Sequence, residues 1–118
     1  MSDLDKAVRT VVHECMGVRP NEEVLVVCNP ATRELGDALR NEAEAIGAQA
    51  VLAVMTERSS HAGEPPATVA EAMVAADVLL APTVQSLSHT AARKRATESG
   101  TRTATLPVAT KEMISREM

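Results

Sequence analysis

Two short polar segments contain the side chains best suited to binding or catalysis. These side chains carry hydroxyl, amide, imidazole and guanidinium groups. One segment follows residue 28, and the other spans residues 83–93. The candidate ligand-binding residues are Asn29, Thr32, Ser86, Ser88, His89, Thr90 and Arg93. Such groups beside free helix-end amides favour a carboxylate or a phosphate ligand. We therefore predict a small-anion site, with ordinary helix capping as the alternative for the Asn, Ser and Thr residues.

His89 is the residue best suited to proton transfer, because an imidazole titrates near neutral pH. No Asp or Glu lies near it in the sequence to orient the ring, and the G-x-S-x-G turn of a serine nucleophile is missing. Neither polar segment is glycine-rich, which disfavours a nucleotide cofactor. His13 precedes Glu14 but lacks the second histidine of a zinc-binding H-E-x-x-H helix. The sequence therefore predicts no catalytic residue and no metal ligand within this chain.

The apolar pattern predicts alternating helices and strands that position the two polar segments. Helical periodicity indicates helices over about residues 2–16, 30–46, 68–76 and 89–99. Apolar runs and alternation indicate strands at about residues 23–28, 48–55, 78–81 and 102–106. This order predicts a single Rossmann-like α/β domain over residues 1–118, with a three-layer, doubly wound parallel sheet of strand order 2-1-3-4. Ligands of such sheets bind at the carboxyl ends of the first and third strands, where both polar segments would lie.

Composition narrows the classes of function. The 118 residues carry a formal charge of −4 and include no Phe, Tyr or Trp, which argues against nucleic-acid binding. The apolar runs are far shorter than the roughly 20 residues of a membrane span, and the first residues are no signal peptide. We therefore expect a cytoplasmic protein with no membrane partner. Cys15 and Cys28 lie in apolar surroundings and are expected to be buried, reduced thiols.

Small residues on the predicted fourth helix suggest a close-packed contact. Ala91, Ala92 and Ala96 form a weak apolar stripe there. Such a stripe allows a helix to pack closely on the sheet or on a second subunit. A homodimer is therefore one expectation for this chain.

Several stretches of the chain resemble a known family. The most specific is S-x-x-H-T-x-A-R at residues 86–93, followed by G-x-R at 100–102 and L-P at 106–107. Residues 22–27, 64–66 and 76–78 also match, so the resemblance covers nearly the whole chain. The sequence resembles the amino-terminal domain of the M29 metal-dependent aminopeptidases, of the aminopeptidase T and S type.

This resemblance implies a two-domain cytoplasmic exopeptidase, often dimeric, that removes amino-terminal residues from peptides with a pair of divalent metals such as cobalt or zinc. A related fold serves the iron-dependent dihydroxypyridine dioxygenases. In the family the metal ligands lie in the carboxy-terminal catalytic domain, and no position of this chain matches a ligand motif. The resemblance therefore implies a non-catalytic amino-terminal domain that walls the substrate cleft, supports assembly and has that catalytic domain as its partner.

Two alternatives to the aminopeptidase domain stay open at this point. The first is a small module that binds an anion at the predicted strand ends, and the second is a homodimeric interaction domain without a ligand. A phospho-acceptor receiver is excluded, because the first predicted strand is followed by Asn29 and Pro30 and offers no carboxylate.

Overall fold

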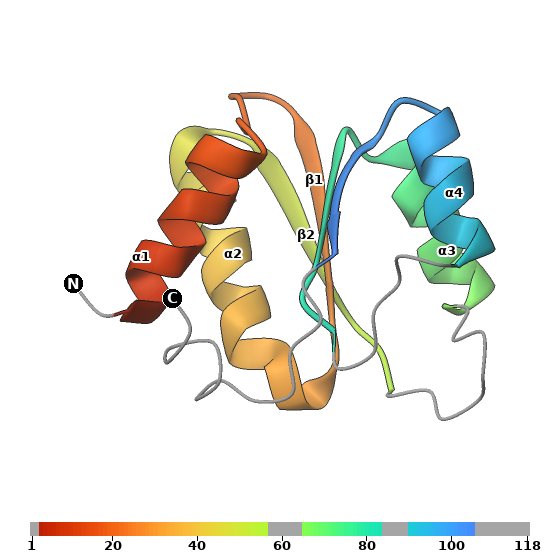
Figure 1. Ribbon diagram of the computed structural model, residues 1–118, viewed down its shortest axis with the longest axis horizontal. Helices are drawn as coiled ribbons and strands as arrows, with labels where there is room; N and C mark the ends of the chain where they lie inside the picture. The colour runs from red at the N-terminus through yellow and green to blue at the C-terminus, as the bar shows by residue number, and fades with distance from the viewer. Residues whose placement is uncertain (1–2, 57–64, 84–89, 106–118) are drawn as a thin grey trace.

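The structure is a computed structural model that describes residues 3–56, 65–83 and 90–105. Its centre is a four-stranded parallel sheet in the order β2-β1-β3-β4 (Figure 1). The strands are β1 (Glu23–Cys28), β2 (Gln49–Val54), β3 (Val78–Ala81) and β4 (Arg102–Thr105). The predicted α/β class, the all-parallel sheet and the strand order 2-1-3-4 are all confirmed.

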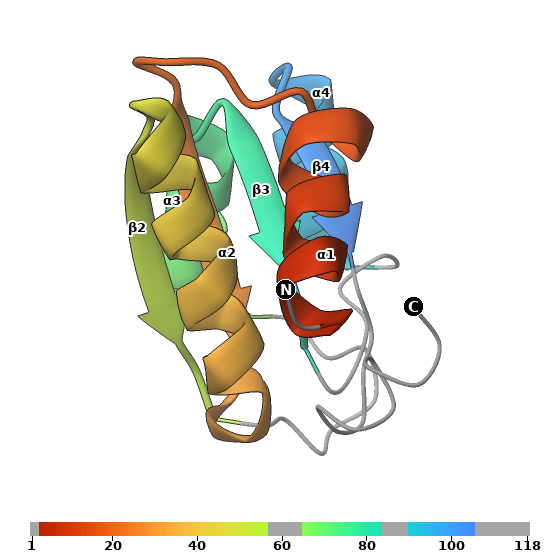
Figure 2. The same cartoon turned by 90° about the vertical axis from the view of Figure 1, so that its left-hand side faces the viewer.

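Helices cover both faces of the sheet, which makes the three predicted layers. One face carries α1 (Asp3–Arg9) and α2 (Arg33–Ile46), and the other carries α3 (Ala67–Ala75) and α4 (Ala91–Glu98) (Figures 1 and 2). A short 3₁₀ turn, η2 (Pro30–Thr32), leads into α2, and a π-helical turn, η1 (Thr10–Cys15), continues α1. None of the described helices is both long and apolar enough to cross a membrane.

The π-helical turn corrects one expectation about the first helix. Cys15 is exposed rather than buried, whereas Cys28 is fully buried. In η1 the amide of Met16 donates to the carbonyl of Val11, five residues back. Because such a turn holds more residues than an α-turn, Cys15 leaves the apolar face that an α-helical period assigns to it.

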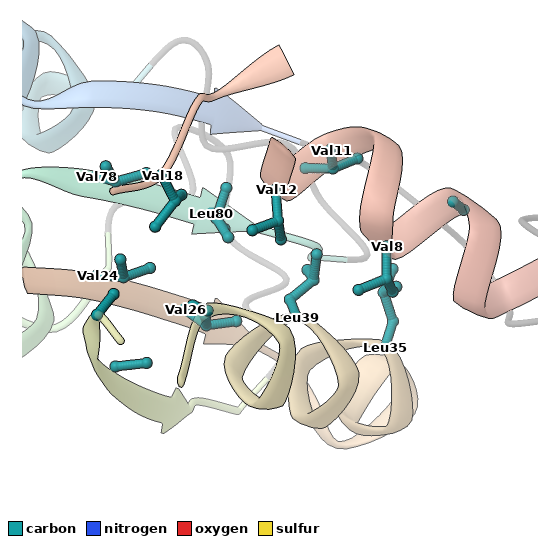
Figure 3. Close-up of a cluster of buried hydrophobic side chains, with 14 residues drawn as sticks. Val8, Val11, Val12, Val18, Val24, Val26, Leu35, Leu39, Val78 and Leu80 are labelled. Atoms are coloured by element: carbon teal, nitrogen blue, oxygen red, sulfur yellow. The ribbon is translucent and has the colours of Figure 1, made fainter. Parts of the chain in front are cut away.

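Two aliphatic cores lie on the two faces of the sheet. Alternate residues of a strand point to opposite faces, so Leu79 of β3 belongs to one core and Leu80 to the other. Figure 3 shows the core between the sheet and helices α1 and α2. It is built from Val, Leu and Ala side chains, among them the fully buried Val12, Val26 and Leu39.

The stripe of small residues on α4 takes part in the second core. Ala92 and Ala96 are buried in the domain itself, beside Met73 of α3. Of the two packings that the stripe allows, Ala92 and Ala96 therefore adopt the first, within the domain itself.

Side chains join the amino ends of the strands. The guanidinium of Arg102 donates two hydrogen bonds to the carboxylate of Glu22, with N···O distances of 2.7 and 3.0 Å. The amide of Glu23 donates to the carboxylate of Asp77 at 2.9 Å. The hydroxyl of Thr101 contacts two backbone carbonyls at the end of α3, at 2.8 and 3.1 Å. Loops entering β1, β3 and β4 are therefore held in register at this edge.

Candidate functional site

The sheet order places the candidate site at the carboxyl ends of β1 and β3. These strands are neighbours, yet the chain leaves β1 toward α2 on one face and leaves β3 toward α4 on the other. Such a divergence is the switch point at which open α/β sheets bind ligands. Asn29 follows β1, and Pro82 and Thr83 follow β3, so the first polar segment and the start of the second meet at this edge.

Asn29 and Thr32 hold the connection between β1 and α2. Both residues are buried, with 3% of each exposed. The side-chain amide of Asn29 donates to the carbonyl of Met55 at 2.9 Å, just beyond β2. The backbone amide of Asn29 donates to the hydroxyl of Thr32 at 3.0 Å. The hydrogen bonds of both side chains thus fix the backbone between β1 and α2 beside the end of β2.

Thr90 begins α4 on the other side of the site. Its hydroxyl accepts a hydrogen bond from the amide of Arg93 at 3.1 Å, which makes Thr90 the N-cap of the helix. Thr83 is nearly inaccessible, with 1% of its surface exposed, and it was not among the predicted ligand-binding residues. Its position directly after a buried strand and a proline is the sequence signal for it.

Arg93 carries a buried hydrogen-bond donor near the start of α4. It lies in the first turn of α4 and is half-buried. Within the described part of the chain, its Nε is a buried nitrogen without a hydrogen-bond partner. A buried donor that lacks a partner costs about 1–3 kcal/mol. An acceptor oxygen from a ligand would remove that cost.

The other three predicted residues, Ser86, Ser88 and His89, lie outside the described residues. Their convergence with Asn29, Thr32, Thr90 and Arg93 stays a prediction.

Where ionisable side chains of the described ranges meet, they form ion pairs rather than metal-binding clusters. No three His, Cys, Asp or Glu side chains among those residues come together in a way that could hold a metal ion. His13 is bonded instead to Glu42, with 2.7 Å between Nε2 and Oε2, on the surface between η1 and α2. These side chains therefore do not fit the two-metal centre that the family resemblance implies.

Two shifted pKa values belong to a contact at the opposite end of the sheet. Hydrogen bonds from Arg102 hold the pKa of Glu22 below its usual value, and the same contact raises the pKa of Arg102. At the candidate-site end of β1, burial raises the pKa of the Cys28 thiol, which keeps it protonated. Glu22 and Arg102 belong to two of the stretches that resemble the family, so these stretches meet in a structural contact.

Comparisons with known proteins report likeness in fold. No protein-family model matches the chain, and no curated protein does so either. The structure is similar to 2,5-dihydroxypyridine dioxygenase from Pseudomonas putida KT2440, with a TM-score of 0.69 and 14% identity over 87% of this chain. It is also similar to AmpT from Thermus thermophilus, with a TM-score of 0.57 and 16% identity over 82% of this chain. The chain spans about a third of the length of each, covering 34% and 32% of them.

Proposed function

We propose that this chain is the amino-terminal α/β domain of an M29-like metal-dependent aminopeptidase. The main support for this proposal is the likeness in fold to AmpT, an M29 aminopeptidase. The likeness covers 82% of this chain but only 32% of AmpT. The motifs at residues 86–93 and 100–102 point to the same family. Fold likeness and motif resemblance concern different features, because the first depends on the backbone path and the second on side-chain identity.

The proposed role is to build one wall of the substrate cleft and to support assembly. A carboxy-terminal catalytic domain would hold the divalent metals, cobalt or zinc, which activate water for peptide hydrolysis. This chain's own residues contribute a rigid edge, in which Asn29 and Thr90 fix the two connections beside the switch point. We accordingly expect the isolated chain to lack peptidase activity.

One experiment separates the aminopeptidase from the dioxygenase suggested by the other structural likeness. The native polypeptide carrying this sequence is isolated from its source cells, weighed by mass spectrometry and assayed twice. The first assay follows release of amino-terminal residues from peptides with Co²⁺ or Zn²⁺. The second follows oxygen-dependent consumption of 2,5-dihydroxypyridine with Fe²⁺.

We expect a polypeptide about three times as long as this chain, with metal-dependent aminopeptidase activity and no dioxygenase activity. The isolated 118-residue chain, tested with the same metals, is the matched inactive control. Dioxygenase activity, or a native polypeptide of 12.5 kDa without peptidase activity, would contradict the proposal.

A second candidate function is binding of a small carboxylate or phosphate at the switch point. The buried, unpartnered Nε of Arg93 among the described residues favours it. Phosphate and acetate are titrated against the amide signals of Thr83 and residues 90–93. We expect a saturable shift that Arg93→Gln abolishes and that the exposed neighbour variant Lys94→Gln retains. Resonances that stay in place would remove this candidate.

A further inference from the structure

The outer edge of β2 presents unpaired backbone groups. In a β-strand, the N–H and C=O groups of one residue point to the same side, and those of the next residue point to the opposite side. The amides of Gln49 and Met55 donate to β1, to the carbonyls of Glu22 and Cys28, each at 2.8 Å. The backbone N–H and C=O groups of residues 50, 52 and 54 therefore point away from β1. Among the described strands, β2 has no neighbour on that side.

This edge lacks the features by which proteins usually prevent strand pairing. Edge strands are commonly protected by charged side chains or proline. The six residues of β2 include neither. Val51 is 61% exposed and Val54 is 42% exposed. Val51 also lines a groove of about 200 Å³ against Ala72 and Ala75 of α3. The edge is thus both apolar and free to form hydrogen bonds.

A row of alternating charges on α2 runs beside this edge. It consists of Arg33, Asp37, Arg40 and Glu44, which pair along the helix at 3.8 Å and 3.2 Å. The opposite flank of α2 faces α1, where Glu42 meets His13. Figure 2 shows β2 at the margin of the sheet, with α2 beside it and α1 farther away.

Along the strand direction, the charged row of α2 lies beside the middle of β2. A Cβ placed on Gly36 would lie 3.1 Å from the Leu52 side chain, so this turn of α2 stands directly over Leu52. The centre of the row, between Asp37 and Arg40, is then within about one helical turn of Leu52.

We propose that this face binds a second copy of the chain, with the two β2 strands antiparallel about a two-fold axis at Leu52. The outward backbone groups then face each other, Leu52 against its own copy and Ala50 against Val54 of the partner subunit. Val51 packs against Ala53 of the partner subunit on the α3 side of the sheet. The two four-stranded sheets become one continuous sheet.

The charges on α2 identify a second copy, rather than another strand, as the occupant. About the two-fold axis, the α2 helix of the second copy runs in the opposite direction. Because the four charges alternate in sign, each one then lies opposite a charge of the other sign. Arg33 faces Glu44 of the partner subunit, and Asp37 faces Arg40 of the partner subunit. The ion pairs between the two α2 helices thus favour the same alignment as the outward backbone groups of the two β2 strands. Isologous contacts of this kind close at two subunits.

The first test places charges on the edge. Sedimentation of the full chain at micromolar concentrations, followed by interference optics because the chain has no aromatic residues, is expected to give twice the 12.5 kDa monomer mass. The double variant Val51→Lys and Val54→Lys is expected to weaken self-association by about tenfold or more. Because both valines are exposed, the variant should still fold, which its far-ultraviolet circular dichroism checks, while its melting temperature should fall only by the stabilisation that dimerisation gives the unchanged chain.

The second test checks the register through charge exchange. Arg40→Asp alone places two acidic residues opposite each other, and Asp37→Arg alone does the same with two arginines, so each variant should be monomeric. Mixing the two variants restores both opposite-charge pairs and should give a heterodimer. Lys94→Glu on α4, outside the proposed interface, is the control and should dimerise like the unchanged chain.

A monomer at every concentration would overturn the proposal. A dimer that survives the lysine substitutions and both charge reversals would also overturn it, because the contact would then lie elsewhere. Growth into larger aggregates without a stable dimer would contradict the closed two-fold arrangement. None of these outcomes depends on peptidase activity, so this test and that of the proposed function can fail separately.

Discussion

Glu22 and Arg102 form an ion pair with two hydrogen bonds, in which each group shifts the pKa of the other. Arg102 binds both carboxylate oxygens of Glu22, and its Nε lies 3.3 Å from the carbonyl of Met16. The arginine thereby connects the edge strand β4 with the loop that precedes β1. The Glu22 side chain is only 16% exposed, which makes the contact stronger than a freely solvated surface pair.

The lowered pKa of Glu22 makes stability depend on pH. The folded pKa lies below the unfolded one, so the contribution is complete above the unfolded pKa and disappears as pH falls through the folded pKa. We expect Glu22→Gln to lower the free energy of unfolding by about 1 kcal/mol at neutral pH and less in acid. Urea unfolding at both pH values measures this. Glu44→Gln, in a more exposed pair, is the control, and an equal loss at both pH values would contradict the assignment.

At the scale of elements, α2 approaches the sheet closely at Gly36. A side chain there would place its Cβ 2.9 Å from the Cys28 sulfur and 3.1 Å from Leu52 Cδ1. Glycine in the middle of a helix costs about 1 kcal/mol relative to alanine when space is free. Close packing against β1 and β2 thus offsets the weaker helix propensity of glycine.

We expect Gly36→Ala to destabilise the domain by about 1–3 kcal/mol, because overpacking of a filled core outweighs the gain in helix propensity. Asn41→Ala, on the exposed surface of the same helix, is the control and should be neutral or slightly stabilising. Thermal unfolding of the two variants measures the difference. A higher melting temperature for Gly36→Ala would show that α2 can move away from the strands.

Elements whose signals are local were predictable from the sequence. The apolar run of β1 and the periodic stripe of α2 ending at Gly47 agree with the structure, and their alternation led to the correct strand order. The π-helical turn at Thr10–Cys15 was not predictable, because its hydrogen bonds are set by packing rather than by residue type. That turn is why the expectation for Cys15 was wrong.

The candidate site was predictable in place but not in its contacts. A topological rule puts Asn29 at the edge of the sheet, whereas its hydrogen bond to Met55 joins residues 26 apart in sequence. The buried Nε of Arg93 likewise depends on how α4 docks. Partners so far apart in sequence become visible only once the sheet order is known.

At the scale of the whole molecule, one sheet supports two separate cores. β3 contributes Leu79 to the core under α3 and α4, and Leu80 to the core under α1 and α2, and both are fully buried. Because every layer contacts the same four strands, loss of either core should weaken the entire domain. The two cores are thus expected to unfold together.

Leu79→Ala and Leu80→Ala test this coupling from the two sides of one strand. Each should lower the free energy of unfolding by about 2–5 kcal/mol, the usual cost of a buried leucine truncated to alanine. Hydrogen exchange should then accelerate in α2 and in α3 alike for both variants. Faster exchange confined to the helices of the altered face would show two independent folding units.

The division of the two cores along the chain also orders their assembly during synthesis. Of the core beneath α1 and α2, every member except Val78 and Leu80 lies within the first 50 residues. The ribosome therefore releases β1, α2 and β2 with most of one core before β3 exists. Because a domain folds as a unit, these early elements complete their core only when β3 has been added. β3 therefore completes the core beneath α1 and α2 and also begins the core beneath α3 and α4.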